Sequence, residues 1–226
     1  MRNIRLEKIS DMVMKGVVAA DIGTDHALLP VSLVRGGICP KVYACDIAEG
    51  PLKSARKTIA AAGMQDQIEV ILSDGFDNVP MDTECAVIAG MGYYTAAAIL
   101  EKAIGRIGML KQIIVEVNRN VREMREWIST HGFTILDEAL VSDRGFDYVI
   151  ISFNTEPHAP YTETELECGP LLMERGSEEY LDFCRRTIAA QEKILAKMNP
   201  ASPQADFVRK RIVLWQEATK KPSHDG

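Results

Sequence analysis

The sequence predicts an α/β fold in which a doubly wound sheet with an antiparallel edge precedes a helical C-terminal part. Five short apolar runs alternate with helix-like segments up to residue 132, which is typical of parallel strands joined by helical crossovers. Two longer apolar runs follow with only a short turn between them, which predicts a hairpin. Beyond residue 160 the pattern is helical.

The five predicted parallel strands are short and end beside glycine or polar residues. They span residues 17–22, 41–46, 68–72, 86–89 and 112–117. Helices between them are predicted at residues 27–34, 51–62 and 121–130, and glycine follows each. Pro30 is tolerated in the first helix if that helix starts near Asp25 or His26, because the proline then stays close to the first turn.

The predicted hairpin pairs residues 133–141 with 148–153 across a turn at 142–145. A change of composition at residues 154–160 predicts a linker between two domains, residues 1–156 and 157–226. The second domain shows a coiled-coil-like apolar repeat, interrupted by Gln191, at Leu181, Cys184, Ile188, Leu195 and Met198. After a break at residues 199–203, the inner face of a return helix is marked by Val208, Ile212 and Trp215.

Composition excludes several classes of protein. The chain has 226 residues, 46% of them hydrophobic, but no apolar run approaches the ~20 residues of a membrane span. The N-terminus lacks the apolar core of a signal peptide. Five scattered cysteines without a CxxC pair predict reduced thiols in a cytoplasmic protein rather than zinc ligands. We therefore expect neither a membrane nor a metal partner.

Charge is distributed unevenly along the chain. The formal net charge is -6, yet residues 185–221 hold nine basic and three acidic residues, a local charge of +6. Such a segment could face the phosphates of a nucleic acid. A solvated helix face explains the same charges equally well.

The turn Asp21-Ile22-Gly23-Thr24-Asp25-His26 follows the first predicted strand and opens the first predicted helix. A dinucleotide site needs three glycines here, so that the pyrophosphate can approach bare backbone. Only Gly23 is present, and the carboxylate of Asp25 would repel phosphate. A cationic ligand without phosphate fits better, and S-adenosylmethionine carries a sulfonium and an ammonium. Alternatively, Thr24 or Asp25 only caps the helix.

Acidic residues also stand at the next two strand ends. Asp46 ends the second strand and can accept both ribose hydroxyl protons of a nucleoside. Asp74 follows the third strand, where it can meet the adenine amino group, although Ser-Asp-Gly is also a common turn. At the end of the fourth strand, two glycines in Gly90-Met91-Gly92 would let a flat base approach the backbone. Tyr93 or Tyr94 could stack on that base or pack under the helix.

Together these motifs resemble the bacterial tRNA (adenine-N1)-methyltransferases that act on adenine 22. The resemblance covers most of the chain and rests on Asp21 to Pro30, Ala44-Cys45-Asp46-Ile47 with Gly50-Pro51-Leu52, Ser73-Asp74-Gly75 and Ile88-Ala89-Gly90-Met91-Gly92. The family usually has glycine where Tyr93 stands and Gln-Pro-Asn where this chain has Glu116-Val117-Asn118. These departures lie beside the expected acceptor base.

The resemblance implies a Rossmann-like class I methyltransferase domain that binds S-adenosylmethionine, and a coiled-coil-like domain that helps to hold tRNA. The expected cofactor-binding residues are Asp21, Gly23, Thr24, Asp46, Ile47, Asp74, Gly75, Gly90, Met91 and Gly92. The expected catalytic residues are Asp25, which would stabilise positive charge on the base, Asn118, which would orient the adenine edge, and, with less support, His26. We expect a monomer or a weak dimer.

Three other functions fit parts of the sequence. The chain could methylate another RNA position or a small molecule, which the residues at Tyr93 and Glu116 would allow. It could also be a non-catalytic RNA-binding module that retains the donor site. A nicotinamide-dependent dehydrogenase is disfavoured by the missing glycines and by Asp25.

Overall fold

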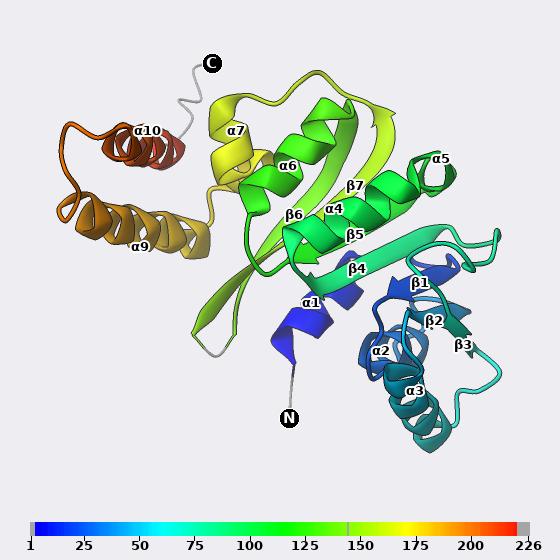
Figure 1. Cartoon of the computed structure of the whole chain (residues 1–226). Helices are drawn as coiled ribbons and strands as arrows, with labels where there is room; N and C mark the ends of the chain where they lie inside the picture. Colours follow the sequence, from blue (N-terminus) through cyan, green and yellow to red (C-terminus); the bar gives the residue numbers. More distant parts are fainter. Residues whose placement is uncertain (1–2, 144, 221–226) are drawn as a thin grey trace, which may run out of the picture.

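A computed structural model describes residues 3–143 and 145–220 and contains one seven-stranded sheet (Figure 1). The order of the strands is β3-β2-β1-β4-β5-β7-β6, in which β1 to β5 are parallel and β7 is antiparallel to both of its neighbours. This arrangement confirms the predicted fold class. The strands are β1 (Ala19–Ile22), β2 (Val42–Asp46), β3 (Ile68–Leu72), β4 (Cys85–Met91), β5 (Gln112–Val117), β6 (Phe133–Asp143) and β7 (Phe146–Pro157).

Helices cover both faces of the sheet, because side chains that alternate along each strand feed two separate cores. One face packs against α1 (Ile4–Met12), α2 (Leu28–Arg35) and α3 (Glu49–Ala62). The other packs against α4 (Tyr93–Lys102), α5 (Ile104–Ile107) and α6 (Val121–Thr130). The alternation matters at the end of β1, since Asp21 faces the α1 side and Ile22 the α4 side.

Helix α1 is not among the helices predicted from the sequence, yet it packs into one of the two cores. Its N-cap Asn3 accepts a hydrogen bond from the backbone N–H of Leu6, and Ile9 and Met12 are buried in the core shared with α2. An apolar spacing of three to four residues and the asparagine cap are the signals that predict such a helix. The helix brings Arg5 to the carboxyl ends of β4 and β5.

In the turn between β1 and α2, neither Thr24 nor Asp25 caps the helix. Asp25 and Ala27 both have positive φ, at 44° and 53°, and α2 begins only at Leu28 with no side-chain cap. The Thr24 hydroxyl instead donates to Asp21 Oδ2 at 2.7 Å. Pro30 is the third residue of α2, within its first turn as predicted.

The hairpin is longer than predicted, and this changes the expected linker. Strand β7 continues to Pro157, and its residues from Asn154 onward still pair with β6. The linker predicted for residues 154–160 is therefore wrong in its first half. The predicted turn at 142–145 includes Arg144, which lies outside the described residues.

The C-terminal part consists of α7 (Glu163–Cys168), α8 (Pro170–Arg175), α9 (Glu178–Leu195) and α10 (Pro203–Ala218). Helices α9 and α10 form the helical arm that projects from the sheet in Figure 1. The predicted repeat is confirmed at Cys184 and Gln191, which are buried in α9, and the return helix buries Ile212 and Trp215. Because Cys184 and Trp215 belong to the same core as the sheet, the division at residue 156 stays a prediction.

A buried ion pair joins this C-terminal part to the sheet. Arg125 of α6 donates to Glu138 of β6 at 2.7 Å, with both side chains at most 3% exposed. Arg125 also donates to the carbonyl oxygens of Leu166 and Glu167, and Glu138 accepts from the N–H of Leu171. Between them lies Gly169 at φ +93°, where a Cβ would come within 3.0 Å of both charged groups.

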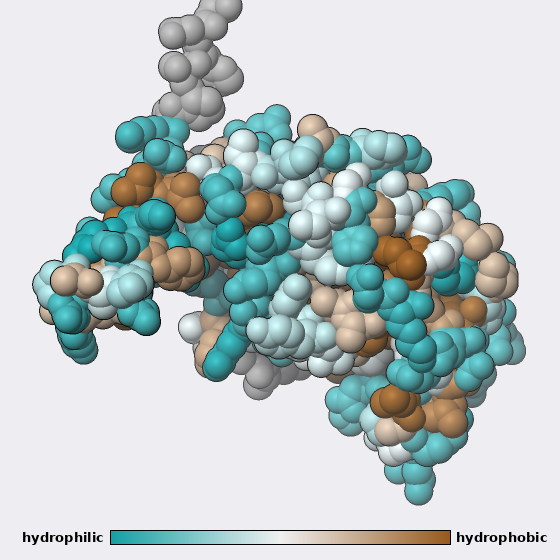
Figure 2. Space-filling view, turned by 45° about the horizontal axis from the view of Figure 1, so that its top comes forward, coloured by the Kyte–Doolittle hydropathy of each residue, from teal (hydrophilic) through white to brown (hydrophobic). Residues whose placement is uncertain are grey.

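A membrane-spanning helix and a cluster of metal-binding side chains are both absent from the described residues. Their helices include none long and apolar enough to span a bilayer, and their acidic, histidine and cysteine side chains form no group suited to a metal ion. All five cysteines are buried free thiols. Figure 2 shows that hydrophilic side chains cover most of the helical arm, at the left of the view.

Candidate functional site

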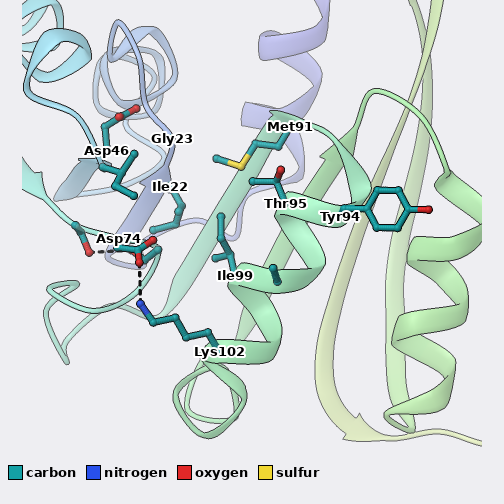
Figure 3. Close-up of a pocket in the computed structure, with 13 residues that line it drawn as sticks. Ile22, Gly23, Asp46, Asp74, Met91, Tyr94, Thr95, Ile99 and Lys102 are labelled. Atoms are coloured by element: carbon teal, nitrogen blue, oxygen red, sulfur yellow. Dashed lines mark hydrogen bonds and ion pairs between the residues drawn. The ribbon is translucent and has the colours of Figure 1, made fainter.

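A cavity of about 590 Å³ opens at the carboxyl ends of β1 to β4 (Figure 3). Strand order reverses between β1 and β4, and α/β sheets bind ligands at such switch points. The strand ends contribute Ile22 and Gly23 at the end of β1, Asp46 and Ile47 at the end of β2, Asp74 and Gly75 after β3, and Met91 of β4. Helix α4 contributes Tyr94, Thr95, Ile99 and Lys102. Six of the predicted cofactor-binding residues therefore meet in one place.

A second hollow adjoins the first and shares Gly23 with it. Its volume is about 260 Å³, and it is bordered by Asp21, Thr24, Asp25, His26, Gly90 and Arg5. Asp25 and His26 lie on its exposed side, where their side chains form an ion pair at 3.4 Å when the histidine is protonated. The hollow thus presents two carboxylates and one guanidinium, a set that matches the opposite charges of an amino-acid group.

Asp21 is the buried acid of this hollow. Burial raises the pKa of its carboxyl to about 6, the Thr24 hydroxyl acts in the opposite direction, and the nearby Asp46 carboxylate adds to the rise. Thr24 is itself buried, so its hydrogen bond also fixes the carboxylate in place. A desolvated carboxylate of this kind is stabilised by a cation that comes into contact with it.

The carboxylates of Asp46 and Asp74, at the end of β2 and just after β3, differ in the partners they already have within the chain. Asp46 Oδ1 accepts the backbone N–H of Ala48, which leaves Oδ2 available to the cavity. Asp74 is exposed and forms an ion pair of 2.9 Å with Lys102, which also contacts Asp77 at 2.6 Å. Figure 3 shows Lys102 reaching from α4 toward Asp74 across the floor of the cavity. Lys102 is not among the residues predicted for the site, because no pattern near it in the sequence marks it.

A β-bulge shapes the end of β4. The register between β4 and β5 shifts between Ala89 and Met91, and Gly90 stands out with φ +78°. Its N–H donates to Glu116 Oε2 at 2.9 Å, and its carbonyl accepts from Asn118 Nδ2 at 3.1 Å. The side chain of Glu116 in β5 and that of Asn118 just after β5 therefore bind the bulge at its N–H and at its carbonyl group.

Glu116, which departs from the family pattern, has a clear structural role. It is fully buried and pairs at 2.6 Å with Arg5 of α1, whose guanidinium also lies 5.3 Å from the centre of the Tyr148 ring. A third hollow of about 360 Å³ is bordered by Arg5, Gly90, Asn118 and Tyr148, and it shares Arg5 and Gly90 with the second. The departure at Glu116 is thus compensated within the chain by Arg5.

Met91 and Gly23 show why glycine is required after β1. Figure 3 shows the Met91 side chain extending across the cavity toward Gly23. A Cβ on Gly23 would lie 2.2 Å from Met91 Cε, a contact that the flexible methionine side chain can relieve by rotating. The φ of +83°, which L side chains rarely adopt, is therefore what requires glycine here. Gly92, in contrast, is the exposed N-cap of α4 and does not border any of these three hollows.

The two tyrosines have different surroundings. Tyr93 is partly buried against the core on the α4 side, and burial together with Glu123 and Glu126 of α6 raises its pKa. Tyr94 is 79% exposed at the rim of the large cavity, and Figure 3 shows its ring turned away from Met91. Packing under the helix therefore describes Tyr93 better than Tyr94.

The basic residues of the helical arm are partly neutralised. Four of its arginines pair with acidic residues within the described chain: Arg185 with Asp182, Arg186 with Asp147, Arg209 with Asp206 and Arg211 with Glu167. Exposed lysines remain at Lys193, Lys197 and Lys210, and no ion pair of theirs involves a described residue. Any phosphate-binding surface on the arm rests mainly on these lysines.

Comparison with known proteins agrees with this geometry. Residues 2–151 match a family model described as "Methyltransferase domain". The chain is 29% identical over 170 residues to the tRNA (adenine(22)-N(1))-methyltransferase of Bacillus subtilis strain 168, covering 74% of this chain and 71% of that protein. It is 30% identical over 176 residues to a Mycoplasma pneumoniae protein named "Putative tRNA methyltransferase", covering 75% and 80%.

A solved structure extends the likeness to the whole chain. Streptococcus pneumoniae Sp1610, described as "a putative tRNA (m1A22) methyltransferase", is known in complex with S-adenosyl-L-methionine. The two structures superpose with a TM-score of 0.87 at 27% sequence identity, over 97% of this chain and 100% of the other. The likeness includes the helical C-terminal part and confirms the predicted methyl donor.

Proposed function

Because the chain belongs to the methyltransferase-domain family, and within it to the tRNA (adenine(22)-N(1))-methyltransferases, we propose that it methylates N1 of adenine 22 in tRNA with S-adenosylmethionine. The observation that carries this proposal is a series of three neighbouring hollows, of which the first two share Gly23 and the last two share Arg5 and Gly90. It joins a nucleoside-sized cavity to a charged hollow and then to an open acceptor side.

The residues present fit the donor by size and charge. The large cavity offers Asp46 to the ribose hydroxyls and Asp74 to the adenine amino group. The charged hollow offers the carboxylates of Asp21 and Asp25 to the ammonium and the guanidinium of Arg5 to the carboxylate of the amino-acid end. When bound, the donor supplies an electrophilic methyl group on its sulfonium.

The acceptor needs little acid–base chemistry. N1 of adenine has a lone pair in the base plane, so it can attack the methyl carbon in line as the carbon–sulfur bond breaks, without prior loss of a proton. The protein must position the base and stabilise the positive charge that forms on it. We assign the positioning to Asn118, whose Nδ2 is fixed on Gly90 and whose Oδ1 can accept from the adenine amino group.

We assign the stabilisation of positive charge to Asp25. Its carboxylate is exposed in the hollow that Gly90 also borders. Asp25 has a positive φ, and this uncommon backbone conformation sets the direction in which its side chain leaves the turn. His26, which contacts Asp25, orients that carboxylate.

Replacing Asp25 with alanine is expected to lower methyl transfer by about 100-fold or more, because one electrostatic contact to a developing charge contributes that much. Transfer of a labelled methyl group to tRNA measures the effect. Thermal unfolding should be nearly unchanged, since Asp25 is exposed and helix α2 does not depend on it for a cap. His26→Ala serves as the matched neighbour with a smaller loss. Near-normal turnover of Asp25→Ala would exclude the assigned role.

The acceptor position can be tested directly. A tRNA transcript is incubated with the protein and donor, digested, and analysed for 1-methyladenosine by mass spectrometry, with the position mapped in fragments. We expect the modification at adenine 22 and none in a transcript with guanosine at that position. Methylation at another position, or of a small molecule only, would contradict the proposed substrate.

Replacing Lys193, Lys197 and Lys210 together with glutamine is expected to weaken tRNA binding and to lower the salt slope of log Kd by about three. The reason is that each phosphate contact releases about one counterion. The matched control changes Lys15, Lys53 and Lys57, which are equally exposed on other elements. Deleting the arm is a poorer test, because Trp215 is part of the main core. Equal slopes in both variants would show that the arm does not contact phosphates.

We also propose that the protein acts in the cytoplasm as a monomer or weak dimer. Five free, buried thiols support a reducing compartment. Light scattering over a range of protein concentrations measures the oligomeric state.

A further inference from the structure

A separate cavity of about 310 Å³ lies where the helical arm meets the sheet. Its lining comes from α6, β7 and α7 to α10, and it includes Arg122, Glu167, Phe183, Thr187, Arg211 and Trp215. Its lining includes Asn120, which is two residues along the chain from Asn118 in the third hollow, where the acceptor base is proposed to bind. We call it the arm cavity.

Glu167 is the most unusual residue of the arm cavity. Its carboxylate is 1% exposed, and Oε1 accepts three hydrogen bonds, two from Arg211 at 2.9 and 2.7 Å and one from Trp215 Nε1 at 2.8 Å. Oε2 accepts none from the described residues. Arg122 Nε lies 3.7 Å from Oε2, beyond hydrogen-bond distance, and the other nitrogens of Arg122 bind Glu126 and Glu163.

An unpaired oxygen on a buried carboxylate is costly, so a partner that donates a hydrogen bond is expected. A metal ion does not suit this place, since Arg122, Arg125 and Arg211 all border the cavity. A simple anion would be repelled by Glu167 itself. A neutral, flat molecule with an N–H group and an apolar body satisfies both conditions, because Phe183 and Trp215 supply aromatic surface.

We propose that the arm cavity is a second nucleotide site, which binds an unpaired tRNA base through an exocyclic amino group that donates to Glu167 Oε2. The inference rests on the proposed function, since tRNA is the partner that carries such bases. Stacking on aromatic side chains and hydrogen bonding of base edges are the usual means of reading unpaired RNA. The neighbouring arginines and the Thr187 hydroxyl suit the sugar and phosphate of the same nucleotide.

The first test replaces Glu167 with glutamine. Glutamine retains an oxygen for Arg211 and Trp215 but puts an NH2 group where Oε2 stands, so an acceptor becomes a donor. We expect the KM for tRNA to rise about tenfold, with kcat at saturating tRNA and the Kd of the donor unchanged. A second variant, Thr187→Met, fills the cavity without touching the bonds of Glu167, and the same rise in KM is expected.

The second test identifies the base. Transcripts carry inosine, purine riboside or pyrimidin-2-one riboside at single positions, each of which removes one amino group. With the unchanged protein, one position should show a loss of about tenfold in equilibrium affinity for tRNA. With Glu167→Gln, the same substitution should cost nothing further, because the two changes remove one contact.

Two results would overturn the proposal. One is an unchanged KM for both Glu167→Gln and Thr187→Met. The other is an equal cost of every amino-group removal with both proteins, which would leave Glu167 as a support of the arm alone. If no tRNA is methylated at all, the proposed function fails, while tRNA affinity measured without donor still decides on the nucleotide site.

Discussion

Replacing Asp21 with asparagine is expected to make the protein more stable at neutral pH and at the same time to weaken donor binding about 100-fold. Burial raises the pKa of Asp21 to about 6, above the ordinary value of 3.8. The folded state therefore holds the proton more tightly than the unfolded state, and stability falls as the pH rises from about 4 to about 6. Above pH 6 the ionised carboxylate lowers the free energy of unfolding by about 3 kcal/mol, at ~1.36 kcal/mol per pH unit.

Asparagine removes this cost and keeps an oxygen for the Thr24 hydroxyl. Urea unfolding should show a gain in stability that grows between about pH 4 and about pH 6 and is nearly constant at higher pH. Donor binding, measured by calorimetry, should be lost because a buried charge no longer meets its cationic partner. Asp66→Asn, at an exposed position, is the matched control and should change neither quantity. A variant that binds the donor normally, or that is no more stable at pH 8, would contradict the assignment.

Replacing Glu138 with leucine is expected to lower the free energy of unfolding by about 3–5 kcal/mol. The guanidinium of Arg125 would remain buried without a counterion, and the N–H of Leu171 would lose its acceptor. Because this pair holds the segment around Gly169, the C-terminal helices should detach first. Limited proteolysis between residues 158 and 176 and urea unfolding together measure both effects.

The matching double variant separates charge from packing. Arg125→Met combined with Glu138→Leu should recover most of the lost stability, since neither side chain then leaves a charge unpaired. Asp182→Ala, which breaks the exposed pair with Arg185, should have little effect. If the double variant were as unstable as Glu138→Leu alone, the pair would matter for its shape rather than for its charge.

Much of the fold and of the donor site could be predicted because both depend on local patterns. Parallel strands end at the same edge of the sheet, so acids after three successive strands had to lie near one another. Asp46 and Asp74 border the large cavity as expected, and Asp21 lies in the hollow next to it because side chains alternate along β1. Their roles in binding the donor stay predictions.

What could not be predicted depends on contacts between distant residues. Arg5 and Glu116 are separated by 111 positions, and no pattern near either one announces their ion pair. Without it, Glu116 could be interpreted only as a departure from the family. The bulge at Gly90 could not be predicted either, because a bulge is defined by the pairing of β4 with β5. The sequence of β4 alone does not show which residue lies out of register. The free oxygen of Glu167 could be found only from the packed helices.

The bulge at Gly90 also determines how much of the chain must be synthesised before the protein can bind the methyl donor. A nascent chain makes the turn after β1 early, but Gly90 receives its two partners only when residues 116 and 118 have been made and β5 has joined the sheet. Strand β5 in turn is flanked by β7, which ends at Pro157. A ribosome-bound chain shorter than this should therefore fold its first βα units without yet binding the methyl donor.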